Sequence, residues 1–329
     1  MKALFIGGTG NISTSVSRMA VEQGVELYLL NRGTREVYIP GAHSIVGDIN
    51  APDAVAKALD GHTFDVVVNW IAYTVEDIER DLALFAGNTA QYIFISSASV
   101  YQKPPTSPFI TESTPLCNPY WDYSRRKIAC EERLMQAHRE NGFPMTIVRP
   151  SHTYDIVFPV SIGGWNDYTL VDRMKRGEKI IVHGDGTSLW TVTHAEDFAR
   201  GFVGLMANPR ALGHAFHITS DESLTWNQIY ETIAQAAGIE AKIVHIPSDF
   251  LISVEPGMEG GLLGDKSWSV IFDNTKIKTF VPSFKAVIPF HVGIRRTLDW
   301  FHADPARRRI IPGINQQIDR FITAYEGKE

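Results

Sequence analysis

Short runs of apolar residues alternate with amphipathic stretches through the first half of the chain. Runs that end at glycine or at polar residues predict buried strands at residues 3–6, 26–30, 44–46, 65–70, 91–95 and 145–148. Apolar residues at helical spacing predict helices after Ile12, after Pro52 and from Pro119 to about Gly142. Strands and helices that alternate in this way predict an α/β fold with a doubly wound parallel sheet.

The pattern changes after Pro150, where loops become longer and richer in glycine, tryptophan and proline. Helical spacing recurs near residues 168–176, 195–206, 226–237 and 293–301. We therefore expect a first domain at residues 1–154 and a smaller α+β lobe at residues 155–329. Such a lobe is compatible with the return of one or two strands to the main sheet.

Composition describes an ordinary globular protein. Of its 329 residues 44% are apolar and 21% are charged, which supports a sizeable core. The net charge of −6 argues against nucleic acid as a partner, and the basic run at residues 307–309 is short enough to be a solvated face. Cys117 and Cys130 have no metal-type spacing, so no metal site is predicted.

The first apolar run is too short for a signal peptide, and no stretch reaches membrane-spanning length. These features predict a cytoplasmic protein with no membrane partner.

A glycine-rich loop follows the first predicted strand. Gly7, Gly8 and Gly10, with Thr9, Asn11 and Ile12, lie directly between that strand and a predicted helix. Glycines permit a tight turn and close approach of backbone N–H groups to a pyrophosphate, and the helix N-terminus favours its charge. Ser13 replaces the third glycine of the usual pattern and is small enough to keep helix and strand close. The loop predicts that residues 1–154 form a dinucleotide-binding Rossmann domain and that the second lobe binds substrate.

The end of the second predicted strand indicates which dinucleotide is bound. NAD sites place a carboxylate there to bind the ribose 2′-hydroxyl. Here Leu30 is followed by Asn31 and Arg32, and the first carboxylate is Glu36. A guanidinium can pair with a 2′-phosphate. NADP(H) is therefore favoured as the cofactor, and NAD(H) stays possible.

Tyr123 and Lys127 lie about one helical turn apart and share a helix face. Alone, the pair is a weak signal. It gains meaning from the glycine loop before it and from the serine cluster at Ser96 and Ser97.

Taken in order, these motifs resemble those of the extended short-chain dehydrogenase/reductases, the NAD-dependent epimerase/dehydratase superfamily. The ordered set consists of Gly7-Gly8-Thr9-Gly10, Gly47-Asp48-Ile49, Ser96-Ser97-Ala98-Ser99-Val100-Tyr101, Tyr123-x-x-x-Lys127 and Arg149-Pro150. The segments at residues 183–186 and 194–197 resemble the C-terminal landmarks of this superfamily, so the resemblance covers nearly the whole chain.

The resemblance implies roles for individual residues. It implies that Ser97 is the active-site serine, Tyr123 the general acid/base and Lys127 its partner. In addition to the loop residues above, it implies cofactor contacts at Asp48, Ile49, Trp70, Ile71, Ala72 and Pro150. His152 takes a place where the superfamily often has an asparagine that contacts substrate.

These roles make chemical sense. Hydride transfer between a carbinol carbon and nicotinamide requires a proton to leave or join the oxygen. A free tyrosine, with a pKa of about 10, is a poor base at neutral pH. A lysine ammonium and the positive nicotinamide ring are expected to lower the pKa of Tyr123, and Ser97 can hold the reacting oxygen in line.

Two departures from the superfamily pattern narrow the reaction. Sugar-nucleotide 4,6-dehydratases resemble one another in an Asp-Glu pair after the catalytic serine or threonine, whereas this chain has Ala98 and Ser99, which argues against that dehydration. Trp190 stands where nucleotide-sugar epimerases usually have an arginine for the substrate pyrophosphate. An indole cannot neutralise a diphosphate, although it can stack on a sugar face or simply pack between lobes. A substrate without a nucleotide is therefore plausible, with candidate contacts at Tyr73, Ser99, His152, Trp165 and Trp190.

The favoured hypothesis is an NADP(H)-dependent oxidoreductase with a small, sugar-like carbonyl or carbinol substrate. The alternative is a sugar or nucleotide-sugar epimerase that reduces its cofactor transiently. A third hypothesis is a cofactor-sensing or RNA-associated atypical relative. A homodimer is possible, with Ile128, Leu134 and Met135 either at its interface or in the core.

Overall fold

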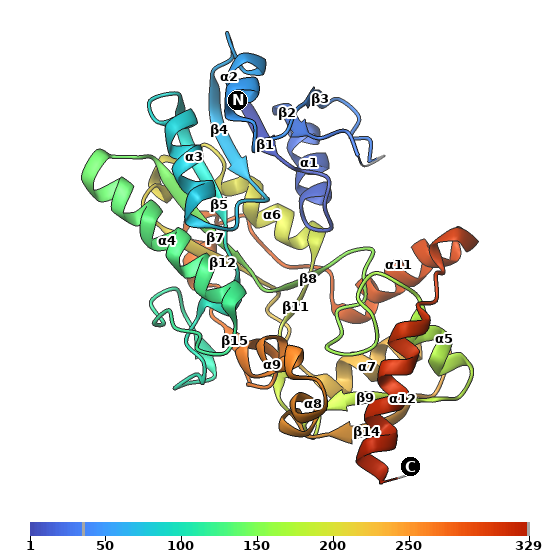
Figure 1. The fold of residues 1–329 in the computed structure, drawn as a ribbon. Coiled ribbons are helices and arrows are strands. Elements are labelled where there is room, and N and C mark those ends of the chain that lie inside the picture. Colours follow the sequence, from blue (N-terminus) through green and yellow to red (C-terminus); the bar gives the residue numbers. More distant parts are fainter. Residues whose placement is uncertain (35–36, 328–329) are drawn as a thin grey trace.

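The computed structural model describes residues 1–34 and 37–327 (Figure 1). Glu36, the first carboxylate after Leu30, lies outside the described residues.

A seven-stranded parallel sheet forms the centre of the larger lobe, in the order β3-β2-β1-β4-β5-β7-β12. Its central strands are almost fully buried, as their apolar runs predict. The strands are β1 (Lys2–Ile6), β2 (Glu26–Asn31), β3 (His43–Val46), β4 (Phe64–Asn69), β5 (Thr89–Ile95), β7 (Met145–Pro150) and β12 (Ala215–Ile218).

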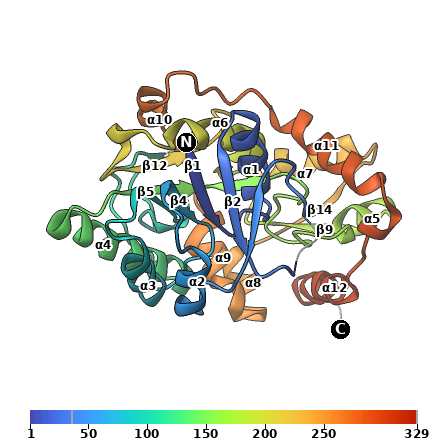
Figure 2. The same cartoon turned by 90° about the horizontal axis from the view of Figure 1, so that it is seen from above.

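Helices cover both faces of this sheet (Figure 2). One face carries α1 (Ser13–Glu22), α6 (Ala195–Leu205) and α10 (Thr275–Phe280), and the other carries α2 (Pro52–Ala58), α3 (Val75–Phe85) and α4 (Asp122–Asn141). The expected doubly wound Rossmann fold is confirmed. β12, from the second half of the chain, returns to the sheet beside β7. Because every strand is parallel, their carboxyl ends meet at one edge, where α/β proteins bind ligands.

The smaller C-terminal lobe has two apolar cores, one around α7 and α11 and one around α12 and β14. Its helices are α5 (Thr169–Lys175), α7 (Trp226–Ala236), α8 (Ser248–Val254), α9 (Glu259–Gly261), α11 (Phe290–His302) and α12 (Pro312–Glu326). Its strand pairs are β8 (His152–Tyr154) with β11 (Val192–His194), β9 (Lys179–His183) with β14 (Lys242–Ile246), and β10 (Leu189–Trp190) with β13 (Leu224–Thr225). A further short pair, β6 (Phe109–Ile110) with β15 (Ile271–Phe272), lies near β12.

Some predicted boundaries differ from the observed ones. α4 begins at Asp122 rather than at Pro119, because the Asn118 side-chain oxygen accepts the N–H groups of Tyr120 and Trp121 and holds that turn outside the helix. α3 was not predicted, although Thr74 and Asp77 form a capping box at its start. On α4, Leu134 is fully buried in the core and is not available to a second copy.

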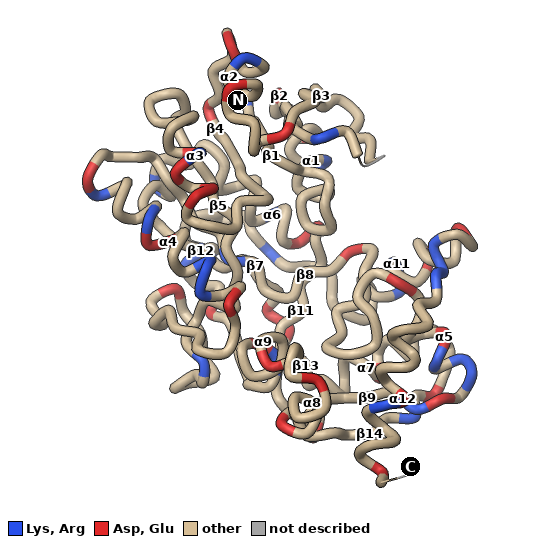
Figure 3. The backbone as a smooth tube through the Cα atoms, in the orientation of Figure 1, with Lys and Arg blue, Asp and Glu red and all other residues tan. Residues whose placement is uncertain are grey.

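Basic and acidic residues are interspersed along the chain in both lobes (Figure 3). Within residues 1–34 and 37–327, every helix is too short or too polar to cross a lipid bilayer.

Candidate active site

The glycine loop has the shape that its sequence predicts. Gly7 and Gly8 both have φ of +95°, a conformation that other residues rarely adopt. A Cβ atom on Gly7 would lie 3.2 Å from the Trp70 Cβ, and one on Gly8 would lie 2.8 Å from a Leu29 methyl carbon. Ser13, in the place of the third glycine, accepts the Gly10 N–H at 2.8 Å. The turn therefore depends on glycine at its first two positions and uses serine at the third.

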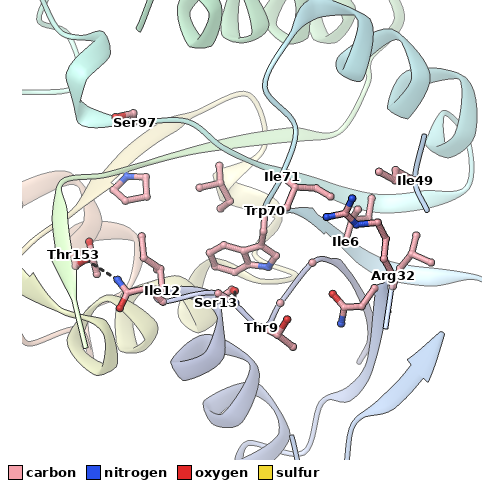
Figure 4. A pocket seen from close by; sticks show the side chains of 18 of the residues that line it. Ile6, Thr9, Ile12, Ser13, Arg32, Ile49, Trp70, Ile71, Ser97 and Thr153 are labelled. Atoms are coloured by element: carbon pink, nitrogen blue, oxygen red, sulfur yellow. Dashed lines mark hydrogen bonds between the residues drawn. The ribbon is translucent and has the colours of Figure 1, made fainter. Parts of the chain in front are cut away.

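A cavity of about 680 Å³ opens above this loop at the carboxyl edge of the sheet. Arg32 and Ile49 lie at one end of it, Trp70 near its middle, and Ser97 and Thr153 at the other end (Figure 4). Nearly all predicted cofactor residues line it, namely Gly7, Thr9, Gly10, Asn11, Ile12, Asn31, Arg32, Asp48, Ile49, Trp70, Ile71 and Pro150. The Ile71 side chain is apolar yet 56% exposed in this wall. The elongated cavity, its glycine cradle and its apolar side wall fit a dinucleotide.

Ala72 does not line the cavity, but it holds a catalytic candidate in place. Lys127 Nζ donates to the carbonyl oxygens of Ala72 at 2.7 Å and Ile95 at 2.8 Å. Burial lowers the pKa of Lys127 to about 8, because the interior disfavours its charged form. Lys127 also lies 5.9 Å from the centre of the Tyr123 ring. The lysine is thus fixed next to Tyr123 by two backbone carbonyls.

The Tyr123 phenol lies at the Ser97 end of the cavity. Burial raises its pKa above the ordinary value, and a hydrogen bond with Ser97 acts in the opposite direction. The expected lowering of the Tyr123 pKa is therefore not produced by the described protein groups alone.

Ser97 belongs to a chain of hydroxyl groups. The Ser97 and Ser99 hydroxyls are 2.9 Å apart, and the Ser124 hydroxyl donates to that of Ser99 at 2.7 Å. The Asn118 amide donates to the Ser99 carbonyl and so links this chain to the start of α4. Ser97 is oriented by its neighbours rather than left free to rotate.

A second cavity of about 430 Å³ continues from the first toward the C-terminal lobe. Both cavities are lined by the same six residues at their junction, which are Ser97, Tyr123, Pro150, Ser151, His152 and Trp165. Ser99 and Trp190, two further predicted substrate residues, line the second cavity alone. A substrate there would meet a dinucleotide in the first cavity beside Tyr123.

Tyr73 is the predicted substrate residue that lines neither cavity. Its ring packs beside that of Tyr123, with centroids 5.5 Å apart, and beside the Arg126 guanidinium. The structure therefore places Tyr73 outside both cavities, with its ring against that of Tyr123.

Residues 69–72 at the end of β4 are held by a buried polar network. Asn69 Oδ1 accepts the N–H groups of Ile71 and Ala72, both at 2.8 Å. The Asn69 amide and the Tyr92 hydroxyl each donate to Asp81 Oδ2, and the other oxygen of this carboxylate pairs with Arg80. This network fixes the backbone that contacts Lys127 and carries Ile71.

Several lining residues were not anticipated from the sequence. Trp121, Val160, Ser161, Asp265 and Lys266 contribute to the second cavity from loops and short helices. No motif marks them, and Asp265 and Lys266 lie far along the chain from Tyr123. Across the ranges that the structure describes, no group of three metal-ligating side chains gathers.

The family model for the NAD dependent epimerase/dehydratase family matches residues 3–219 of this chain. Among curated proteins, 2'-dehydrokanamycin reductase of Streptomyces kanamyceticus is 24% identical over 87% of this chain and 80% of its own length. UDP-glucose 4-epimerase of Lactobacillus helveticus is 31% identical over 85% of this chain and 90% of its own. Chloroplast stem-loop binding protein of 41 kDa b from Arabidopsis thaliana is 29% identical over 76% of this chain and 67% of its own.

Solved structures have the same fold. UDP-glucuronic acid 4-epimerase from Bacillus cereus, solved with UDP-glucuronic acid and NAD, aligns with a TM-score of 0.73. The alignment covers 92% of this chain and 99% of the other at 18% identity. At that identity the likeness concerns the fold alone.

Proposed function

Because this chain belongs to the NAD dependent epimerase/dehydratase family, we propose that it is an NADP(H)-dependent oxidoreductase. Its substrate is a small, hydroxylated, sugar-like carbonyl or carbinol compound. The observation that carries the proposal is the junction of two cavities at Ser97, Tyr123 and His152. The cavity with the glycine cradle suits the dinucleotide, and the smaller one suits the compound that exchanges hydride with it.

A bound nicotinamide supplies or accepts the hydride, and the side chains at the junction handle the proton. Tyr123 donates a proton to the substrate oxygen during reduction and accepts one during oxidation. Ser97, which hydrogen-bonds with Tyr123 and lines both cavities, orients the same oxygen. The Lys127 ammonium, when protonated, favours the phenolate of Tyr123.

Preference for NADP(H) is proposed on the basis of Arg32. Its exposed side chain lies at the end of the cavity next to Asn31, Asp48 and Ile49. A guanidinium there can form a bidentate pair with a 2′-phosphate. If NADH bound at least as tightly as NADPH in a direct titration, this preference would be wrong.

Replacement of Tyr123 by phenylalanine tests the catalytic proposal. Tyr123→Phe removes the proton donor but keeps the ring that packs on Tyr73. We expect turnover to fall by about 10²–10⁴-fold, the usual contribution of general acid–base catalysis, while NADPH affinity stays within a few fold. Nicotinamide absorbance measures turnover, and fluorescence titration measures binding. Tyr325→Phe, which removes an exposed phenol on α12, is the matched control. Full turnover in Tyr123→Phe would remove this residue from the mechanism.

Similarity to UDP-glucose 4-epimerase favours a second candidate, an epimerase that takes hydride and returns it to the opposite face. Similarity to a reductase favours net redox chemistry. Net change in nicotinamide absorbance separates the two candidates, since a pure epimerase leaves its cofactor unchanged after each turnover.

The similarity to a stem-loop binding protein keeps an RNA-associated role as a third candidate. The net charge of −6 and the Ser97, Tyr123 and Lys127 arrangement argue against it. Tight, salt-sensitive binding of a structured RNA, together with no hydride transfer on any sugar or polyol, would favour it over the oxidoreductase.

A further inference from the structure

Two aromatic rings in the wall of the second cavity pack against the same third ring. His152 and Trp190 both line this cavity, and both pack against the fully buried Trp226, with ring centroids 5.9 and 5.8 Å from it. Trp226 is itself held by a hydrogen bond from its indole N–H to the Lys266 carbonyl at 3.0 Å. His152 and Trp190 therefore share one rigid support.

Each of these rings carries a polar atom that the fold leaves unpaired. The indole nitrogen of Trp190 and the Nε2 atom of His152 are shielded from solvent and have no hydrogen-bond partner in residues 1–34 and 37–327. An unpaired buried polar group destabilises the folded protein. Such groups at the wall of a cavity are well placed for pairing with a bound molecule.

The two atoms have opposite hydrogen-bonding character. Burial holds the pKa of His152 well below its ordinary value, and the nearby Lys266 charge acts in the same direction, so the ring is neutral. The Pro159 carbonyl, which can only accept, hydrogen-bonds with the His152 ring. Since Nε2 is the unpaired nitrogen, Nδ1 carries the proton and Nε2 is an acceptor. Trp190 is a donor, so the pair offers one of each.

Other polar groups in this wall already have partners. The Ser161 hydroxyl lies 2.8 Å from the His183 ring nitrogen, and the Ser151 hydroxyl donates to the Thr191 carbonyl. The Ser99 hydroxyl accepts from that of Ser124. The unpaired groups left to recognise a ligand in this wall are therefore His152, at the junction, and Trp190, in the second cavity alone.

The charges in the wall cancel. Asp265 and Lys266 are the charged residues that line the second cavity, and their side chains pair at 3.0 Å. The Lys266 ammonium also lies 5.8 Å from the Trp121 ring centre. A diphosphate would bring two negative charges against one lysine that is already neutralised. Three indoles (Trp121, Trp165 and Trp190) instead offer apolar faces of the kind on which a sugar ring stacks.

We infer that the second cavity binds an uncharged, monosaccharide-sized ring, such as a pyranose or a cyclitol, and not a nucleotide sugar. Hydroxyl groups of that ring accept the Trp190 N–H and donate to His152 Nε2. A ketone, an ether or a carboxylate can only accept, so it leaves His152 unpaired. Recognition of a hydroxyl away from the reacting carbon thus sets the specificity. This inference rests on the proposed function, since the same substrate meets the nicotinamide at Tyr123.

Variants at the two rings test the hydrogen-bonding pair. Trp190→Phe and His152→Phe remove the polar atom but keep an aromatic ring. Each is expected to raise KM on the order of tenfold with a smaller change in kcat, because the lost bond is present before reaction. NADPH affinity should not change in Trp190→Phe, because Trp190 lines the second cavity alone. Circular dichroism shows whether both variants fold. Trp300→Phe, which removes an indole outside both cavities, is the control. Variants that behave like Trp300→Phe would overturn the pairing.

A panel of ligands tests the substrate class. The uncharged probes are glucose, galactose, mannose, myo-inositol and the deoxyglucoses, and the charged ones are glucuronic acid, glucosamine and UDP-glucose. With wild-type protein and NADP⁺, we expect hydride transfer from at least one uncharged probe, and kcat/KM at least tenfold lower for its charged counterparts. The deoxy form that lacks the paired hydroxyl should lose about tenfold in wild type and little in Trp190→Phe. Equal or better use of UDP-glucose would overturn the inference while leaving the proposed function intact.

Calorimetry on the NADPH complex separates the two possible failures. Binding of an uncharged probe that weakens in Trp190→Phe, with no hydride transfer, would support the cavity assignment and contradict the proposed function. Absence of binding by every uncharged probe would overturn the inference.

Discussion

Lys127 shows how the fold changes the chemistry of a single side chain. Its ammonium donates to two backbone carbonyls in a buried position, and burial lowers its pKa to about 8 from a reference of 10.5. From the sequence, Lys127 was an ammonium beside a tyrosine at helical spacing. The structure adds the desolvation that brings its titration close to neutral pH.

This shift predicts how stability depends on pH. Below pH 8, Lys127 is protonated in both the folded and the unfolded chain, and the fold bears the cost of burying the charge. Between pH 8 and 10.5, the folded chain has released the proton and the unfolded chain still binds it. Stability relative to Lys127→Met should therefore rise with pH in this window, by at most about 1.4 kcal/mol per pH unit.

Denaturant unfolding of wild type and Lys127→Met at several pH values measures this difference. Lys57→Met, which removes an exposed lysine on α2, controls for loss of an amine. A difference between wild type and Lys127→Met that stays constant across the window would contradict the buried position of the ammonium.

The ordered motifs and the family resemblance that they carry marked Ser97, Tyr123 and Lys127 as candidates, and the structure brings all three to one end of the cavity. Their catalytic roles stay predictions until variants are measured. Tyr73 is different, because its ring lies beside Tyr123 and outside both cavities. Local sequence indicates a residue's neighbours on its own element but not the direction in which a loop turns.

At the scale of elements, the segment after β4 shows how side chains from three elements fix the backbone of one loop. Asn69, Asp81 and Tyr92 come from β4, α3 and β5, and together they fix the backbone of Ile71 and Ala72. Asp81 is almost fully buried, and its desolvation outweighs its favourable partners and raises its pKa. The segment lines the dinucleotide cavity on one side and anchors Lys127 on the other.

We expect Asp81→Asn to loosen this segment. An asparagine side chain has a single oxygen that accepts hydrogen bonds, whereas Asn69, Tyr92 and Arg80 all donate to the Asp81 carboxylate. Arg80 also loses its negatively charged partner. Stability should fall by about 1–3 kcal/mol, and NADPH affinity by on the order of tenfold. Chemical denaturation and fluorescence titration measure the two effects. Asp53→Asn, at an exposed position on α2, is the control. Unchanged NADPH affinity in a folded Asp81→Asn protein would show that the network does not position the segment.

At the scale of the molecule, the dinucleotide cavity connects the two halves of the fold. The Asn11 amide in the glycine loop donates to the Thr153 carbonyl on β8 at 2.9 Å (Figure 4). His152 and Trp165, which close the junction of the cavities, belong to the segment after β7. A ligand that fills the cavity therefore contacts groups from both sides and should stabilise the whole protein.

We predict that NADPH raises the melting temperature more than NADH does. A ligand at one hundred times its Kd stabilises the folded state by about 2.7 kcal/mol, which corresponds to several degrees for a chain of this size. Arg32→Glu should reduce the NADPH effect and leave the NADH effect nearly unchanged, because the variant repels the 2′-phosphate. Differential scanning fluorimetry at matched concentrations measures this, with Arg308→Glu as a remote control. Equal losses for both cofactors would mean that Arg32 does not contact the phosphate.

The sequence by itself determined the Rossmann fold, the family and the candidate site residues, because each is indicated by residues close together in the chain. Strand and helix periods, a glycine turn and a tyrosine–lysine pair are local patterns, and parallel strands bring their ends together by topology. The strands were predicted more accurately than the start of α4, where the Asn118 side chain captures two N–H groups.

Only the tertiary structure decided what surrounds the reacting centre. The packing of His152 and Trp190 on Trp226 and the buried state of Lys127 depend on contacts between residues far apart in the chain. Desolvation and hydrogen-bond pairing are properties of a packed environment, which no short segment contains. The same residues would have different pKa values and hydrogen-bond partners in another packing. The sequence alone therefore did not predict which polar groups of the second cavity are unpaired.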